Sequence, residues 1–265
     1  MSLQTEMISK EFYLSLRKQF IDYTNQFKSN DFFVQKHFRV KQEHSLRVCE
    51  NIVEIGKRIG LTDEQLIVAE TIALLHDIGR FEQYKQYGTF SDNNSVNHAE
   101  LGVAVINQLG LLNELEASVR QLICKTIINH NLPSLHPENN EDIVLYSKLI
   151  RDADKLDIFK VVIDYNKENI SFEPEEPKGY TISDNILNCF NHRHIVDIMD
   201  AKGKFDFFLL RISWIFDINF PATCQLIDQR NYISYLFSKL PKSYRLINIQ
   251  NIVKEHMVNR IFSFA

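Results

Sequence analysis

Six side chains that can hold a metal ion recur along the sequence between residues 44 and 154. They are four histidines and two aspartates, His44, His76, Asp77, His98, His130 and Asp154. Imidazole and carboxylate groups together suit Fe, Mn, Zn or Ni. Four or more such groups meeting at one point would form a hydrolytic or redox metal centre. The elements of the chain must therefore bring these residues together.

Two short strings carry most of this signal. In the first, His76 and Asp77 close a strongly apolar run just before Gly79, which is expected to stop the helix. In the second, Asp154 follows the apolar stretch 143–150. Charged groups are rarely placed on a buried face unless they are paired or bound to metal. Both strings therefore predict buried ligands.

Apolar periodicity predicts helices that carry the six residues on their core-facing sides. Apolar positions recur three or four residues apart, which is the period of one helix face. His44 precedes Val48 by four residues in such a stripe, and His130 ends another that contains Ile123 and Ile127. Facing helices supply the ligands of metal sites in helical bundles. A single histidine on an apolar face is more often a hydrogen-bonded core residue, but six candidates in core-facing phase favour a metal site.

Helix boundaries in this region are marked by residues with known end preferences. Gly60 is expected to end the helix that carries His44. Thr62 and Gln65 form a capping-box pattern at the start of the next helix, and Asn97 caps the helix that begins near His98. Pro133 follows the end of the helix that contains His130.

The order of these residues resembles the HD-domain superfamily of metal-dependent phosphohydrolases. His44, the doublet in LLHDIGR and Asp154 in DADKLD match its conserved positions, over roughly residues 30–165. His98 in NHAELGVAVI and His130 in IINHN resemble the extra histidines of binuclear members. The resemblance implies an all-α HD-domain bundle with a first metal at His44, His76, Asp77 and Asp154. It implies a second metal at His98 and His130, bridged by Asp77.

The same resemblance implies the reaction. One or two divalent transition-metal ions (Fe, Mn, Ni, Co or Zn) would activate water to hydrolyse a nucleotide or another small phosphorylated metabolite, with Asp77 orienting the centre. Asn131 follows His130 where cyclic-dinucleotide phosphodiesterases carry Gly-Tyr-Pro, which argues against cyclic di-GMP. The six-ligand order also resembles HD-type di-iron oxygenases, which use O2 to cleave C–C or C–P bonds. A ligand-sensing HD module that binds metal without turnover is a third alternative.

The segment 80–96 joins Asp77 to His98, so both of its ends adjoin the predicted site. We expect a long loop here, because long loops beside sites are often lids or binding loops. The alternative is that its aromatic residues only anchor the loop to the bundle.

Two cationic and two aromatic side chains are candidates for substrate contact. Arg80 would hold a phosphate bidentately, and Tyr84 or Tyr87 would stack on a base. Lys155, which follows Asp154, is a second predicted phosphate contact, with a surface salt bridge as the alternative. Arg80 and Lys155 would also stabilise the phosphate during catalysis.

Composition indicates a cytoplasmic enzyme without a membrane segment. The chain has 265 residues, of which 45% are hydrophobic and 24% charged, with eight glycines and six prolines, a composition that favours helices. Its net charge of −4 argues against general nucleic-acid binding. No apolar run approaches about 20 residues. The four cysteines show no CxxC pairing and are expected to be free thiols in a reducing compartment.

The chain is predicted to form a single composite all-α domain over residues 1–265. Its HD core covers about residues 30–165, after a first helix at 7–28. A loop at 166–182 leads to a C-terminal helical extension over residues 183–265, with breaks at Pro221 and Pro241. We expect this extension to pack against the ligand-bearing helices. A separate substrate or dimerisation lobe is the alternative.

Overall fold

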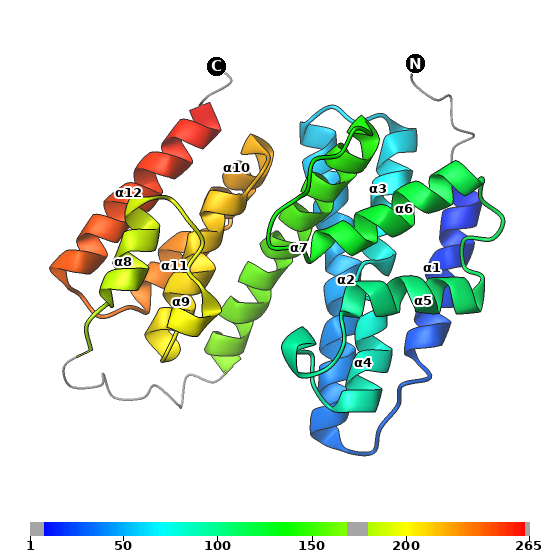
Figure 1. Cartoon of the computed structure of the whole chain (residues 1–265), viewed down its shortest axis with the longest axis horizontal. Helices are drawn as coiled ribbons and strands as arrows, with labels where there is room; N and C mark the ends of the chain where they lie inside the picture. Colours follow the sequence, from blue (N-terminus) through cyan, green and yellow to red (C-terminus); the bar gives the residue numbers. More distant parts are fainter. Residues whose placement is uncertain (1–7, 169–179, 263–265) are drawn as a thin grey trace. The chain divides into compact units, whose positions relative to one another are not determined.

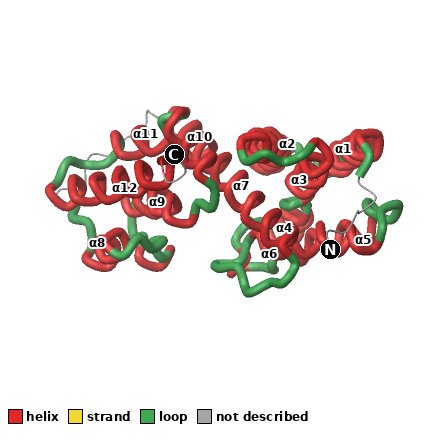
Figure 2. Tube along the Cα trace, turned by 90° about the horizontal axis from the view of Figure 1, so that it is seen from above, coloured by secondary structure: helices red, strands yellow, loops and turns green. Residues whose placement is uncertain are grey.

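The computed structural model describes residues 8–168 and 180–262. Every regular element within these ranges is a helix, as the absence of strands from the described trace in Figure 2 shows. The all-α prediction is therefore confirmed. Of the predicted loop at 166–182, residues 169–179 lie outside the described residues, and the prediction is wrong for residues 166–168, which belong to the helix before it.

The chain divides into two compact units, Met1–Asp157 and Ile158–Ala265, with the boundary inside one long helix. Each unit has its own apolar core. The single composite domain stays a prediction, and the two units are described separately below.

The first unit holds all the residues of the predicted metal site (Figure 1). Its helices are α1 (Lys10–Thr24), α2 (Phe32–Arg58), α3 (Asp63–Leu75), α4 (Gly79–Tyr87), α5 (His98–Leu109), α6 (Ala117–His130) and the greater part of α7 (Glu141–Glu168), with a 3-10 turn, η1, at Asp92–Asn94. Helix α3 packs against α1, α2 and α6, while α5 packs against α4 and α6. The residues of α3 from Ala69 to Leu75 are buried, except Glu70, so the string before His76 is part of the core.

The predicted helix boundaries follow from local chemistry. Gly60 adopts a left-handed φ of 84° just after α2, a conformation that glycine reaches without a Cβ clash. At the start of α3, Thr62 and Gln65 form the reciprocal hydrogen bonds of a capping box. The Asn97 side chain accepts hydrogen bonds from the backbone N–H groups of Ala99 and Glu100 at the start of α5. These predictions are confirmed.

Gly79 has a different role from the helix stop that the sequence suggested. Helix α3 ends at Leu75, and Gly79 is the first residue of α4. A Cβ atom at Gly79 would overlap the carbonyl oxygen of His98 and lie 2.5 Å from the backbone nitrogen of Gly102. Glycine is therefore required because α4 and α5 approach each other backbone to backbone at this point.

The expectation of a long loop over residues 80–96 is wrong for its first half. Residues 79–87 form α4, and Gly88 ends this helix in a left-handed conformation with φ 66°. The run from Arg80 to Tyr87 contains no glycine or proline, and its glutamine, glutamate and lysine residues are good helix formers. The aromatic residues obscured this pattern. Only residues 88–97 connect α4 to α5, and they include η1.

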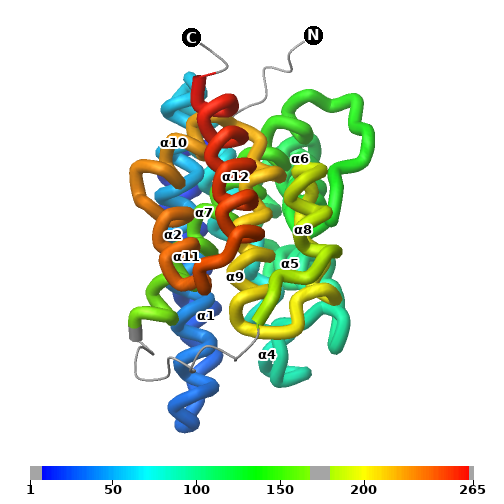
Figure 3. The backbone as a smooth tube through the Cα atoms, turned by 90° about the vertical axis from the view of Figure 1, so that its left-hand side faces the viewer, coloured from blue at the N-terminus to red at the C-terminus, as the bar shows by residue number. Residues whose placement is uncertain are grey.

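The second unit begins within α7 and is built from shorter helices. These are α8 (Asp184–Asn191), α9 (Lys204–Ser213), α10 (Pro221–Gln229), α11 (Tyr232–Ser238) and α12 (Tyr244–Phe262), with the 3-10 turns η3 (Ile198–Asp200) and η4 (Trp214–Asp217). Helix α12 packs along α10 and α8 (Figure 3). Pro221 starts α10 rather than breaking it, since proline fits the first helical position, and Pro241 lies between α11 and α12.

An apolar groove of about 840 Å³ runs beside α12 in the second unit, and no predicted metal ligand lines it. None of the helices in the described ranges combines the length and apolar character that crossing a lipid bilayer requires.

Candidate metal centre

The six predicted ligands come from four helices of the first unit and from the turn after α3. His44 lies in the middle of α2, His98 is the first residue of α5, and His130 is the last residue of α6. His76 and Asp77 follow the last residue of α3, and Asp154 belongs to α7. The four histidines and Asp77 are buried, and Asp154 is partly exposed. Helix ends and a turn thus place ligands that are distant in sequence around one point.

Asp77 links two groups of possible metal-binding atoms. One group is His44, His76 and Asp77, and the other is Asp77, His98 and His130; within each group the donor atoms lie within 4.8 Å of one another. The Oδ2 atom of Asp77 lies 3.6 Å from His44 Nε2 and 3.7 Å from His76 Nε2. Its Oδ1 atom lies 3.3 Å from His98 Nε2 and 3.9 Å from His130 Nε2. One carboxylate oxygen therefore faces each histidine pair, which is the arrangement a bridging ligand needs.

Asp154 adds a second carboxylate on the side of the first pair. Its Oδ1 atom lies 3.1 Å from His44 Nε2 and 3.8 Å from His76 Nε2. Its side chain retains 20% exposure, whereas that of Asp77 retains 4%. Solvent therefore reaches the His44 and His76 side of the cluster at Asp154.

Each of the four histidines is oriented through its Nδ1 atom. The Nδ1 partners are Asp157 Oδ2 for His44 at 2.7 Å, the Ala73 carbonyl for His76 at 2.7 Å, Asp92 Oδ2 for His98 at 2.6 Å and the Ile127 carbonyl for His130 at 2.5 Å. Carbonyl and carboxylate oxygens only accept hydrogen bonds, so each Nδ1 atom carries a proton and donates. In a neutral ring the Nε2 lone pair is then free for a metal.

The Nε2 atoms themselves indicate that a cation belongs in the cluster. Those of His44 and His76 are buried and make no hydrogen bond of normal geometry with any described residue. The Nε2 atoms of His98 and His130 face each other at 3.0 Å. Two imidazole lone pairs repel at this distance unless a proton or a metal ion lies between them. Buried polar atoms rarely lack partners in native proteins, so the residues present fit a bound metal.

The protonation states suit metal ligation for most of the donors. Burial, together with the neighbouring His98 and His76, lowers the pKa of His130 to about 3, and burial also lowers the pKa of His76. Although burial opposes it, the charges of Lys41 and His76 hold the pKa of Asp77 well below its usual range. The pKa of Asp154 is also lowered, against the effect of burial, by its contacts with His44. These groups therefore present lone pairs at neutral pH, as metal binding requires.

His44 is the exception among the histidines. Burial and Lys41 act to lower its pKa, but its contacts with Asp154 and Asp157 outweigh them, and the net pKa lies above 6.5. A metal that binds His44 must therefore displace a proton over a wider pH range than at the other histidines.

Two cations lie against the Asp77 carboxylate. Lys41 Nζ is 2.6 Å from Asp77 Oδ2, and Arg80 Nε is 3.3 Å from Asp77 Oδ1. The Nη1 atom of Arg80 donates to Gln83, to the Phe90 carbonyl and to Asp92. For Arg80 Nη2 no hydrogen bond to any residue in the described ranges is found. One edge of this guanidinium therefore remains for an anion.

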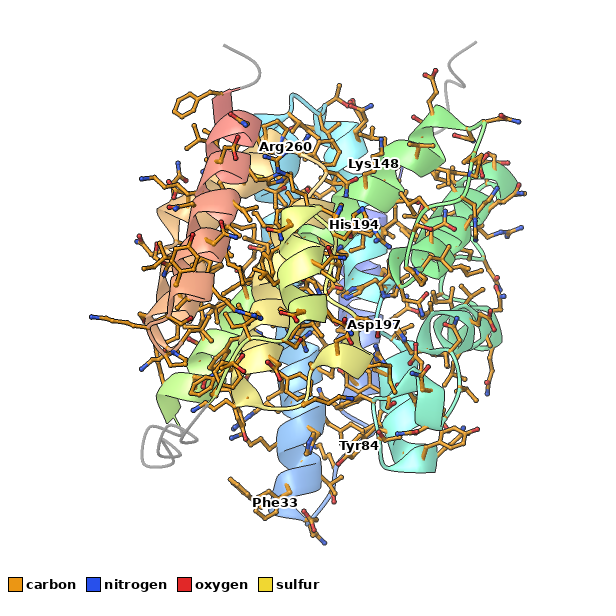
Figure 4. The ribbon with its side chains drawn as sticks, turned by 60° about the vertical axis from the view of Figure 1, so that its left-hand side comes forward. Phe33, Tyr84, Lys148, His194, Asp197 and Arg260 are labelled. Carbon is orange, nitrogen blue, oxygen red and sulfur yellow. The ribbon has the colours of Figure 1, made fainter. Side chains whose placement is uncertain are left out.

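The predicted aromatic contacts lie on α4 at different exposures. Tyr84, labelled in Figure 4, stacks on His37 with ring centroids 4.9 Å apart, and the Phe90 ring is 4.7 Å away. Tyr87 is 46% exposed at the end of α4. Lys155 is half-buried next to Asp154 on α7. The packing of Tyr84 favours an anchoring role over base stacking, while Tyr87 and Lys155 stay predictions.

Three residues at the centre escaped the sequence reasoning as contributors. Lys41 precedes His44 by three residues, and Asp157 follows Asp154 by three, so helical spacing places both on ligand-bearing faces. Asp92 lies in η1, where no helical period could have indicated it. The first two had a readable signal, and the third required the structure.

Part of the chain is similar to a known protein family. The family model described as the HD domain matches residues 42–158, a range that contains all six candidate ligands. No curated protein and no solved structure gives a significant match to the chain.

Proposed function

Because residues 42–158 of this chain match the HD-domain family model, we propose that the protein is a metal-dependent phosphohydrolase with a binuclear centre. The observation that carries the proposal is the Asp77 carboxylate, which offers one oxygen to each of two histidine pairs. Paired metals about 3.5–4 Å apart are the usual arrangement for in-line displacement at phosphorus. His44, His76, Asp77 and Asp154 would hold the first ion, and Asp77, His98 and His130 the second.

The metals would supply activation of water and polarisation of a phosphoryl oxygen, because a bound divalent ion lowers the pKa of coordinated water to about 7. The side chains of the protein fix the geometry of this centre. The four Nδ1 hydrogen bonds keep the proton on Nδ1 and orient each imidazole ring so that Nε2 points into the cluster. Ionised Asp77 and Asp154 neutralise part of the charge of the ions.

Cationic side chains beside the centre favour a phosphorylated substrate over a neutral one. Arg80 has an uncommitted edge, and Lys41 lies against the Asp77 carboxylate with a side chain that is 20% exposed. Lys155, next to Asp154, is the further predicted phosphate contact. Charge-assisted hydrogen bonds contribute roughly 1.5–3 kcal/mol each. We infer a small phosphate ester, with a nucleotide as the first class to examine.

The test measures metal content and phosphate release together. Purified protein is supplied with Mn, Ni, Co, Fe or Zn, its bound metal is determined by elemental analysis, and nucleotides and phosphomonoesters are screened without oxygen. We expect release of phosphate and about two ions per chain. His76→Ala should lose metal and activity together, whereas His192→Ala, an exposed histidine after α8, should keep both.

Two outcomes would contradict the proposal. Full metal content in His76→Ala would show that the first position is wrongly assigned. Failure of the metal-loaded protein to release phosphate from any ester would refute the hydrolase function. If turnover instead required O2, the HD-type oxygenase would be the better description.

A further inference from the structure

We propose that Asp92 is the positioning residue of the second metal position, and that the connecting segment 88–97 thereby controls occupancy of this position separately from the first. The inference rests on the binuclear centre proposed above. It assigns a role to Asp92, which lies in the 3-10 turn η1 and is not one of the proposed metal ligands.

The Asp92 carboxylate receives hydrogen bonds from two helices and from the residue that follows a third helix. Its Oδ2 atom lies 2.6 Å from His98 Nδ1 on α5 and 3.2 Å from the side-chain nitrogen of Asn131, next to the end of α6. Its Oδ1 atom lies 2.9 Å from Arg80 Nη1 and 2.8 Å from Gln83 Nε2, both on α4. Four donors from separate segments hold this carboxylate in one orientation.

The bond to His98 sets how this histidine meets the metal. Because Asp92 accepts the proton of Nδ1, the ring is held with Nε2 inward, 3.3 Å from Asp77 Oδ1 and 3.0 Å from His130 Nε2. A carboxylate partner also raises the basicity of the ligating nitrogen. Loss of Asp92 would leave His98 as the first residue of α5 with a rotatable ring.

The segment that carries Asp92 is tied down by a buried glutamine. Gln83 is fully buried, and its side-chain nitrogen donates to Ser95 Oγ at 2.9 Å and to the Val96 carbonyl at 2.9 Å, in addition to Asp92. Arg80 also bonds the Phe90 carbonyl at 2.5 Å. A movement that opened segment 88–97 would break these bonds and release His98. The closed conformation of segment 88–97 therefore stabilises metal binding at the second position, and metal binding at this position stabilises the closed conformation.

At the first metal position a carboxylate on a different element also holds a histidine through its Nδ1 atom. Asp157 holds His44 Nδ1 at 2.7 Å and is itself held by Arg47 Nε at 2.7 Å. Asp157 and His44 belong to the long helices α7 and α2, and among the described residues no hydrogen bond or ion pair joins either of them to segment 88–97. The two positions thus have separate supports, and each can be weakened alone.

The experiment is a titration of the full chain with Mn²⁺ in the absence of substrate. Calorimetry measures the two binding steps, and the spin-coupled electron paramagnetic resonance signal reports a bound manganese pair. In Asp92→Asn we expect the second binding step to weaken by about 10–100-fold, the usual effect of removing such a partner, while the first step changes by less than about threefold. The coupled signal should be lost at metal concentrations that saturate the unaltered protein. Asp157→Asn should show the reverse, with the first step weakened.

Two further variants separate positioning from charge and from folding. Glu82→Gln removes one negative charge, as Asp92→Asn does, but from a residue of α4 whose partners are Gln86 and Lys85. Both metal-binding steps should therefore be unchanged in this variant. Gln83 makes no hydrogen bond to His98, and Gln83→Met keeps the side-chain volume. The replacement removes three hydrogen bonds to segment 88–97, so the second metal-binding step should weaken. Far-UV circular dichroism verifies that each variant is folded.

Unchanged second-step affinity in folded Asp92→Asn, or equal weakening of both steps, would overturn the proposal. A single ion bound at saturation by the unaltered chain would overturn it together with the binuclear part of the proposed function. Two-step binding with the expected variant pattern but no hydrolysis of any ester would support the role of Asp92 and refute only the phosphohydrolase. The titration contains no substrate, so the two failures are distinguishable.

Discussion

Replacement of Gly79 by alanine tests whether the close contact of α4 and α5 requires a glycine at this position. The added Cβ would overlap the His98 carbonyl oxygen and lie 2.5 Å from the Gly102 nitrogen, and both are backbone atoms that cannot rotate away. The helices must separate, and overpacking of this kind costs about 1–3 kcal/mol. At roughly 2–4 °C per kcal/mol for a chain of this size, the Tm should fall by about 2–12 °C.

The control is the glycine on the facing helix. A Cβ at Gly102 would meet its nearest neighbour, the Gly79 nitrogen, at 3.4 Å, which is ordinary van der Waals contact. Gly102→Ala inside α5 should therefore be neutral or stabilising, since alanine favours a helix interior by about 0.5–1 kcal/mol over glycine. Thermal unfolding followed by circular dichroism measures both. Equal loss of stability in the two variants, or an unchanged Tm in Gly79→Ala, would refute the steric argument.

Four further predictions concern the charged groups and the metals. The pKa of His44 is raised, so protons compete with the metal for this histidine. Metal affinity at the first position should increase by up to about tenfold per pH unit below that raised pKa and level off above it. Metal titrations at a series of pH values measure this profile. Arg80→Ala should lower kcat/KM by about one to two decades, at 1.4 kcal/mol per decade, and Arg80→Lys should recover part of the loss. Lys41→Met should tighten binding of the first metal, because its ammonium competes for Asp77 Oδ2 at 2.6 Å, while weakening inhibition by inorganic phosphate. Chelation should lower the Tm of the metal-loaded protein by the equivalent of about 2.7 kcal/mol if the ion was present at 100 times its Kd.

Helical periodicity was sufficient to predict that two of the candidate ligands face the core. His44 and His130 fall in phase with their apolar stripes, and both are buried in the structure. Gly60 predicted where α2 ends, and the capping residues Thr62 and Asn97 predicted where α3 and α5 begin, because the responsible interactions are local. Local signals of this kind survive without knowledge of the tertiary fold.

Features that depend on contacts between distant segments could not be predicted. Gly79 looked like a helix stop, since nothing in its neighbourhood reveals that another backbone crosses it. The helix α4 was hidden because its aromatic residues suggested a loop that binds substrate. Two of these residues are instead packed against other parts of the chain, Phe81 stacked on Phe38 of α2 at 6.2 Å and Tyr84 against Phe90.

The two proposed metal positions differ in how far helical spacing predicts their support. For the first, Asp157 supports His44 of α2 and lies on α7 three residues after the candidate ligand Asp154, a spacing that places both carboxylates on one helix face. For the second, the supporting carboxylate Asp92 lies in a turn and reaches His98 only because Gln83 and Arg80 hold that turn from α4. A position supported by helices persists while the helices are folded, whereas one supported by a turn depends on local closure, which is less stable than global folding. The second position should therefore be the one that empties first when metal is scarce, and any dependence of turnover on metal concentration would arise there.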